Sequence, residues 1–219
     1  MLAGVTNARK KAEIYHPHTM MYSSTMDLIN AREVHTATLL KNGSVSISGG
    51  QNIYEAELFH AENGSRLTGE MRQPRWFHTA IRLNSRNVLI IGGTDGNRTL
   101  KTTETYHERE GRFITGADMK IPRLGHTTTL LPNGCVIVIG GLPKTGQEVQ
   151  ATDLVEKNCP DGDDNVANNF VTIGRLQEAR AYHTATLLDS TKILVVGGKK
   201  ISVPDREDIL KSLEVVPVN

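Results

Sequence analysis

Short runs of β-branched and aliphatic residues alternate with polar turns along the whole chain. One run is Thr36-Ala-Thr-Leu-Leu40, which is followed by the turn Lys41-Asn-Gly-Ser44 and then by Val45-Ser-Ile-Ser48. Asn-Gly between two such runs is a strong hairpin signal, because both residues tolerate positive φ. The chain shows no helical period of apolar residues, so the pattern predicts an all-β fold built from hairpins.

This hairpin recurs four times at a fixed position relative to four marker residues. In each copy a His stands 14 residues before a Gly-Gly pair, an Arg precedes the His by three residues, and a Thr follows it. The spacings between successive His residues are 43, 48 and 57 residues, so insertions fall in loops. The marker residues are Arg32, His35, Gly49 and Gly50; Arg75, His78, Gly92 and Gly93; Arg123, His126, Gly140 and Gly141; and Arg180, His183, Gly197 and Gly198.

A second, weaker pair of strands is predicted in each unit. One of its strands carries the recurring apolar residues Tyr15, Phe59, Tyr106 and Val155. The other carries Tyr22, Leu67, Phe113 and Phe170. Four short strands in each unit of about 40 to 60 residues indicate the blades of a β-propeller rather than a helical solenoid.

The order Arg-x-x-His-Thr, turn, aliphatic strand, Gly-Gly and Glu-x-Tyr resembles the kelch repeat, in the subclass that reads His-Thr-Ala-Thr-Leu-Leu. The resemblance implies a kelch-type β-propeller of about four four-stranded blades. The second aromatic of a kelch repeat is usually Trp, whereas the only Trp here, Trp76, stands in a different column. We expect one domain over 12–216, with units at about 12–50, 56–93, 103–141 and 152–198, a final partial strand at 212–216, and an N-terminal extension at 1–11.

The sequence allows two arrangements of the blades, a closed ring and a partial arc. The chain starts on the third strand of a blade and ends with Ser212-Leu-Glu-Val-Val216, which looks like the third strand of the next blade. The hairpin over 184–196 could join the strands over 13–22 and close a four-blade ring, but the strand near Leu213 would compete for that place. We therefore favour a partial propeller arc, whose uncovered strand edges would permit self-association.

The marker residues are interpreted as structural. The double glycine lets the backbone turn with positive φ and approach its neighbour closely. The Arg and His residues are expected to tie blade to blade through backbone carbonyls or acidic side chains, namely Glu13, Glu57, Glu104 and Asp153. Four His residues near the axis would also suit a transition metal, but repeats create such rings without one, so we expect no metal and no cofactor.

Two other metal-site interpretations fit less well. Tyr182-His183 before the last Gly-Gly resembles the copper-binding segment of galactose oxidase, but no second His and no Tyr cross-linked to Cys can be matched. The acidic stretch with Asp161, Asp163 and Asn165 lacks the glycine and final Glu of a helix-loop-helix calcium loop. A copper-radical oxidase fragment stays as an alternative. No catalytic constellation is found, so we expect no enzymatic activity.

Composition excludes some classes of partner. Lys plus Arg number 25 and Asp plus Glu number 24, a balance that argues against binding nucleic acid or a membrane surface by bulk charge. No secretory signal or apolar run of bilayer length is found. Two cysteines, one in an aliphatic strand and one in an irregular stretch, make no disulfide framework. Sequons at Asn42, Asn63 and Asn97 permit glycosylation but do not establish export, so the compartment is undetermined.

The resemblance implies a binding scaffold for a protein or peptide, with a glycan as another ligand class. Kelch propellers commonly bind partners on the face formed by the loops that enter the first strand and those that follow the double glycine. On that face we expect Glu33, Val34, Trp76, Phe77, Leu124, Gly125, Ala181 and Tyr182, with Asn52, Asp95 and Arg98 in the loops after the glycines. The aromatic side chains Trp76, Phe77 and Tyr182 are the strongest candidates, because aromatics supply large contact area. A purely structural module, in which Trp76 and Phe77 only cover the gap between blades, is the alternative.

Overall fold

The computed structural model describes residues 10–145, 148–160, 169–202 and 206–218. All secondary-structure elements in these ranges are β-strands. No helix in these ranges is long and apolar enough to span a membrane. The first blade has the order β3-β4-β5-β6, with antiparallel pairing throughout. Its strands are β3 (Thr36–Leu39), β4 (Val45–Ser48), β5 (Glu55–His60) and β6 (Gly64–Glu70).

The next three blades repeat this plan, and each begins directly after a marker His. The second consists of β7 (Thr79–Arg82), β8 (Val88–Ile91), β9 (Thr103–His107) and β10 (Arg112–Thr115). The third consists of β11 (Thr127–Leu130), β12 (Val136–Ile139), β15 (Leu154–Asn158) and β16 (Val171–Arg175). The fourth has three strands in the described residues, β17 (Thr184–Asp189), β18 (Lys192–Val196) and β21 (Leu213–Pro217). The predicted all-β, four-blade β-propeller arrangement is confirmed.

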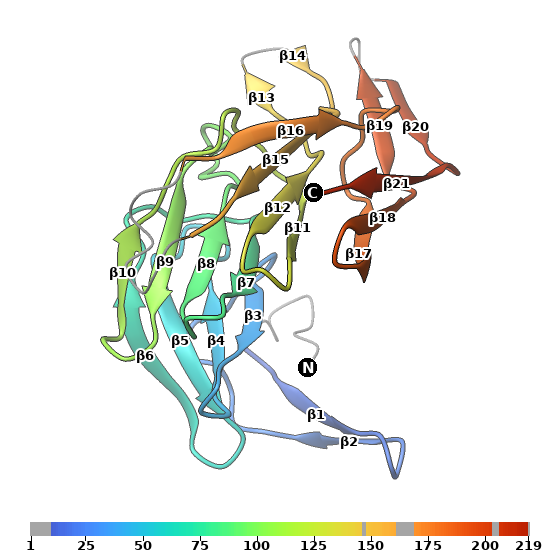
Figure 1. The fold of residues 1–219 in the computed structure, drawn as a ribbon. Coiled ribbons are helices and arrows are strands. Elements are labelled where there is room, and N and C mark those ends of the chain that lie inside the picture. The colour runs from blue at the N-terminus through green and yellow to red at the C-terminus, as the bar shows by residue number, and fades with distance from the viewer. Residues whose placement is uncertain (1–9, 146–147, 161–168, 203–205, 219) are drawn as a thin grey trace.

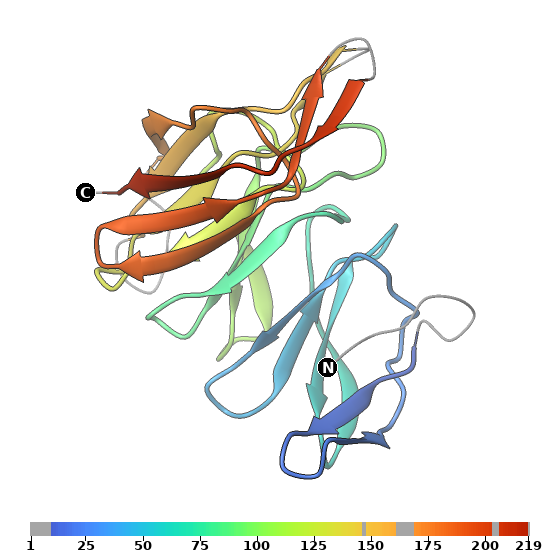
Figure 2. The same ribbon diagram turned by 90° about the vertical axis from the view of Figure 1, so that its right-hand side faces the viewer.

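The blades follow one another from the blue to the red end of the chain, with the innermost strands β3, β7, β11 and β17 in contact in that order (Figures 1 and 2). A separate two-stranded sheet, β1 (Glu13–His16) and β2 (Met21–Ser24), precedes the first blade. β18 pairs with β21 over its whole length. The pairing of the hairpin at 184–196 with the strands at 13–22, which closure through these strands requires, is therefore not formed.

Two short hairpins were not expected from the repeat pattern. β13 (Lys144–Thr145) pairs with β14 (Glu148–Val149), and β19 (Lys199–Ser202) pairs with β20 (Arg206–Ile209). Each follows the double glycine of its repeat, and both project from the same end of the blades (Figure 1). The longest repeat spacing, 57 residues, includes the first of them.

The core lies between neighbouring blades. The second strand of the two central blades is a continuous aliphatic run, Val88–Ile91 in β8 and Val136–Ile139 in β12, and all eight residues are buried. A strand is aliphatic at every position when both of its faces are buried, and here the blade on each side buries them. Recurring aromatic rings also contact one another across paired strands: Tyr15 with Tyr22 in the β1–β2 sheet, and Tyr106 of β9 with Phe113 of β10, each at 5.0 Å between centroids.

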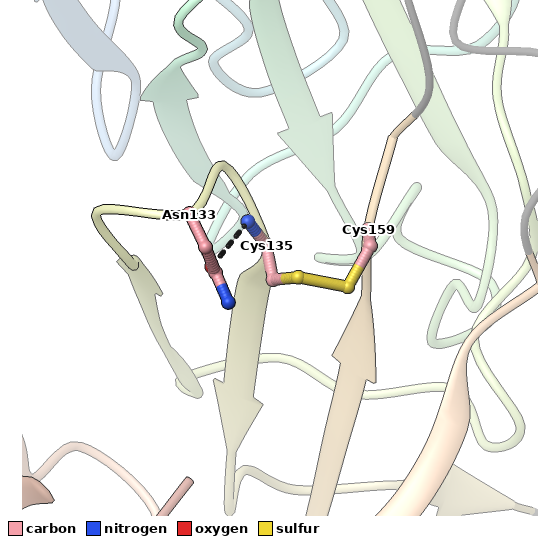
Figure 3. The surroundings of a disulfide bond; sticks show 3 residues. All are labelled: Asn133, Cys135 and Cys159. Carbon is pink, nitrogen blue, oxygen red and sulfur yellow. Dashed lines mark hydrogen bonds between the residues drawn. A yellow bond between two sulfur atoms is a disulfide. The ribbon is translucent and has the colours of Figure 1, made fainter. Parts of the chain in front are cut away.

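A disulfide joins Cys135, just before β12, to Cys159, just after β15 (Figure 3). The register of the two strands places these residues side by side, next to the pair Val136 and Asn158. The Cys135 amide donates to the Asn133 side chain at 3.1 Å, which fixes the turn before β12. This bridge was not predicted, because the sequence pattern places one cysteine in an aliphatic strand and the other in an irregular stretch, whereas Cys159 directly follows β15.

Each marker Arg is buried and forms an ion pair with a Glu on the third strand of its own blade. Arg32 pairs with Glu57 at 2.9 Å, and its Nη1 donates to the Gly49 carbonyl at 2.8 Å. The other pairs are Arg75 with Glu104, Arg123 with Glu156 and Arg180 with Glu214. The arginines therefore hold the segment that enters a blade against that same blade, rather than tying one blade to the next.

Two of the predicted acidic partners are wrong. Glu57 and Glu104 pair with marker arginines as predicted, whereas Glu156 and Glu214 take the places assigned to Asp153 and Glu13. Asp153 precedes β15 and pairs with the exposed Arg175 at 2.7 Å. Glu13 is exposed on β1, because no marker Arg lies beside that sheet in the described residues.

Three of the marker histidines form a hydrogen bond across a blade boundary. His78 Nε2 is 2.8 Å from the hydroxyl of Thr36 in the preceding blade. The same contact joins His126 to Thr79 and His183 to Thr127, each at 2.9 Å. The double glycine lies beneath the next imidazole: a Cβ on Gly140 would come within 2.5 Å of the Arg180 carbonyl and 2.7 Å of His183 Cε1. The expected close approach is confirmed at this glycine, which also has a positive φ.

We expect acid to destabilise this arrangement through the buried imidazoles. Burial lowers the pKa of His78 to about 3 and that of His183 to about 4, with the nearby arginines Arg75 and Arg180 adding to the shift. The unfolded chain takes up these protons near the ordinary pKa of 6.5, so the free energy of unfolding should fall as pH drops from 6.5 toward 4. Thermal melts across this range measure the slope. His183→Gln should flatten it, and an unchanged slope in that variant would contradict the assignment.

Candidate functional site

The loops that enter the innermost strands share an unusual backbone conformation. The residue before each marker His has a left-handed φ, namely +54° at Val34, +53° at Phe77, +60° at Gly125 and +56° at Tyr182. Side-chain-bearing residues seldom adopt this conformation, least of all β-branched ones such as Val34. The loops also bond to one another, since the Gly125 amide donates to the Phe77 carbonyl at 3.2 Å and the Tyr182 amide donates to the Gly125 carbonyl at 2.7 Å. The entry loops of blades two, three and four are thus held as one unit.

A pocket of about 360 Å³ opens on these joined loops. We call it the aromatic pocket. Its lining residues are Trp76, Phe77, Thr94, Gly96, Asn97, Arg98, Leu124, Leu142, Val149 and Tyr182. The second, third and fourth blades each contribute an entry-loop residue, and the segments after the double glycines of the second and third repeats complete the wall.

Glycine at position 125 makes room for the principal aromatic contact. A Cβ at this position would lie 2.7 Å from Cε1 of Tyr182, so the Tyr182 ring occupies the space that any other residue at 125 would fill. The ring meets Phe77 edge to face, with centroids 6.1 Å apart and planes at 78°. Phe77 and Tyr182 keep 39% and 44% of their surface exposed, so both can contact a ligand.

Trp76 is positioned by the loop that follows Gly93. Its amide and carbonyl pair with the carbonyl and amide of Thr94 at 3.1 and 2.9 Å. The indole lies against Gly96, where a Cβ would come within 2.8 Å of the ring. Thr94 in turn donates from its hydroxyl to the Arg98 carbonyl at 2.8 Å, which folds the loop back over the indole. Trp76 is half-buried and forms one side of the pocket.

The rim is polar and its charges are paired. Arg98, the only charged residue in the lining described above, binds Asp95 at 3.3 Å. Burial works against the ionised form of Asp95, but hydrogen bonds from the Arg98 and Asn97 amides outweigh it and lower the pKa of the carboxyl. Burial raises the pKa of the Tyr182 hydroxyl, which is therefore protonated at neutral pH. The pocket suits an apolar or aromatic group, with amide, hydroxyl and guanidinium groups available at its edge.

The predicted candidates divide between the pocket and other places. The structure brings together Trp76, Phe77, Leu124 and Tyr182, with Arg98 at the rim and Asp95 behind it. Glu33, Val34 and Asn52 belong to the first repeat and do not line this pocket. Ala181 is fully buried and pairs through its backbone with Lys199. Gly125 contributes by the space it leaves.

Sequence reasoning missed part of the wall. Leu142 directly follows the double glycine, Val149 lies at the base of the β13–β14 insertion opposite Lys144, and Asn97 and Thr94 lie in the loop over Trp76. The signal that marks these segments is the long stretch between the double glycine and the next strand, because an insertion on the pocket side of a blade adds to the wall there.

The metal-site alternatives receive no support from this geometry. His183 Nε2 is bonded to Thr127, and both cysteines are used in the disulfide, so neither offers a thiol for a cross-link to Tyr. Within the described residues no three His, Cys, Asp or Glu side chains are grouped so as to hold a metal ion. Asp161, Asp163 and Asn165 lie outside the described residues.

Comparison with known proteins bears on the fold. No protein-family model matches the chain, and no curated protein matches it in sequence. Among solved structures, the one titled "Structure of YjhT" is similar, with a TM-score of 0.73 over 89% of this chain and 71% of that chain. The two are 10% identical, so the similarity supports the β-propeller fold and nothing finer.

Proposed function

We propose that this chain is a kelch-type β-propeller module that binds a protein or peptide partner through the aromatic pocket and catalyses no reaction. The observation that carries the proposal is the convergence of Phe77, Leu124 and Tyr182, which occupy matching entry loops of three successive blades, beside Trp76. A repeat need not place large apolar side chains at these positions for its own folding, since the first repeat has Glu33 and the exposed Val34 there.

The kelch assignment is supported by the contacts of the marker residues. Arg pairs with Glu in four blades, His contacts Thr across three blade boundaries, and Gly-Gly lies beneath the next imidazole. Each marker thus has one repeated structural role. This leaves the side chains just before the His free to vary, as a binding surface requires.

Pocket size and chemistry favour a side chain of a protein partner. A volume of about 360 Å³ is at the lower end of the range for ligand sites, roughly 300–1,000 Å³. Aromatic anchors carry much of the energy of protein interfaces. A second candidate, a purely structural role for these rings, has its own support in the contact of Trp76 with Gly96 and of Phe77 with Tyr182.

The two candidates predict different outcomes for Tyr182→Ala. Peptides selected from a random phage-displayed library on the native chain should bind the variant about 30-fold more weakly, the loss expected when an anchor worth about 2 kcal/mol is removed. Trp76 is the only tryptophan, so its emission reports binding at the pocket directly. Titrations of the native chain and the variant, followed by this emission, measure the change.

Tyr54→Ala is the matched control, because Tyr54 is an equally exposed tyrosine of the first repeat outside the pocket. Circular dichroism confirms that both variants are folded. If selected peptides bind the Tyr182 variant as tightly as the native chain and leave Trp76 emission unchanged, the aromatic pocket is not the binding site.

A further inference from the structure

The three Asn-x-Ser/Thr sequons lie at different ends of the blades. Asn97, of the sequon Asn97-Arg98-Thr99, is exposed in the loop over Trp76 and lines the aromatic pocket. Asn42 lies in the turn between β3 and β4, and Asn63 lies in the turn between β5 and β6; both are exposed. Strands β3 and β5 start at the pocket end of the first blade and run away from it, so these two turns lie at the opposite end.

The disulfide is a second, independent observation. Cys135 and Cys159 are paired, and lasting disulfides form in oxidising environments such as the secretory route. The same route attaches glycans to Asn-x-Ser/Thr. The disulfide and the sequons, which involve different residues, therefore both favour the secretory route. One of the sequons lies at the candidate binding site.

We propose that Asn97 carries an N-linked glycan that stands at the mouth of the aromatic pocket and restricts access to it. In the transfer, a bond forms between Asn97 Nδ2 and the anomeric carbon of the first sugar. The bond from that carbon to a lipid-linked diphosphate donor breaks, and Nδ2 loses one proton. The surrounding loop is held by other groups, since Asp95 accepts from the Asn97 and Arg98 amides at 3.0 and 2.9 Å. A glycan on the Asn97 side chain leaves these bonds intact.

The proposed consequence follows from the position of Asn97 beside Trp76. A hydrated glycan at this point covers the part of the pocket that the loop over Trp76 lines, whereas Tyr182 and Val149 of β14 contribute to the lining from other segments. Partners would then reach the pocket from the Tyr182 side only. Whether Asn97 carries a glycan does not depend on the proposed function. That the glycan regulates partner binding rests on the proposed function.

The test uses the full chain secreted from eukaryotic cells behind a cleavable leader. Enzymatic deglycosylation in heavy water, followed by peptide mapping, identifies each occupied asparagine. Access to the pocket is then measured as quenching of Trp76 by a nitroxide carried on a short polyethylene glycol, before and after deglycosylation. We expect occupied Asn97 and a severalfold rise in the quenching constant once the glycan is removed.

Asn97→Gln should reproduce the high quenching constant, and Asn63→Gln should not, because that sequon lies at the other end of the blade. An unmodified Asn97 in chain that carries a glycan at Asn42 or Asn63 would overturn the site, as would secreted chain with all three unmodified. An occupied Asn97 with unchanged quenching would overturn the restriction. Because the quencher is not a partner, these results stay distinct from failure of peptide binding.

Discussion

Replacing Glu156 by alanine should lower the free energy of unfolding by about 3–5 kcal/mol, the usual cost of removing one partner from a buried ion pair. Glu156 and Arg123 are both without exposed side-chain surface. The carboxylate also accepts the Lys120 amide at 2.8 Å, so the variant leaves a buried guanidinium without its counter-ion and a backbone donor unsatisfied. Burial already lowers the pKa of Arg123, and Glu156 is the group that opposes this shift. Urea denaturation of the native chain and the variant measures the difference.

The chain offers a matched control in Asp153→Ala. Asp153 binds Arg175 at 2.7 Å, a distance typical of a strong ion pair, but both side chains are in contact with solvent. Such a pair contributes roughly 0–1 kcal/mol. Should Glu156→Ala fail to fold, Glu156→Gln keeps an acceptor for Lys120 and still tests the charge. Equal losses for the Asp153 and Glu156 variants would show that burial does not set the strength of these pairs.

These two acidic residues also show where sequence reasoning reached its limit. Glu57 and Glu104 could be identified, because they begin a short Glu-x-aromatic motif in the third strand of their repeats. In the third repeat, the β13–β14 insertion lengthens the connection, and the apolar residues no longer reveal where the strand starts. β15 also carries a register shift between Val155 and Glu156. An irregularity of this kind depends on pairing with β16 and has no local sequence signal.

Two segments could form the third strand of the fourth blade. Ser212–Val216 and the strand near Ile14 both have the pattern of a third strand, and the sequence does not rank them. In the structure β21 pairs with β18, and Glu214 reaches Arg180, which gives the fourth blade the same buried ion pair as the others. The pairing is decided by a contact between residues 34 positions apart, which local patterns do not contain.

The candidate site was predictable to the extent that it follows the repeat. Phe77 and Tyr182 stand one residue before a marker His and Leu124 stands two before it, so their location in the entry loops follows from the propeller itself. The contact of Tyr182 with Phe77 could not be foreseen, because it requires the space left by Gly125. Val149 belongs to the β13–β14 insertion, which has no equivalent in the first repeat, so no repeat column indicates it. Leu142 does stand in a repeat column, directly after the double glycine, but the other copies have Gln51, Thr94 and Lys199 there, so the column carries no apolar signal.

Removal of the disulfide is expected to lower the free energy of unfolding by about 3 kcal/mol, because the bridge closes a loop of 24 residues in the unfolded chain. Cys135→Ala with Cys159→Ala tests this without leaving a thiol, and reductant provides a second route. The reductant should have no effect on the double variant, which controls for other actions of the reagent.

The effect should be on global stability and not on the pocket. The bridge joins the ends of β12 and β15 that lie away from the double glycine, whereas Leu142 in the pocket wall follows that glycine. Four register pairs between β12 and β15 separate the two positions and remain when the bridge is cut. Trp76 emission and its quenching in the folded double variant should therefore match those of the native chain, while its urea midpoint falls. An altered Trp76 signal at low urea would mean that the disulfide shapes the binding face as well as constraining the unfolded chain.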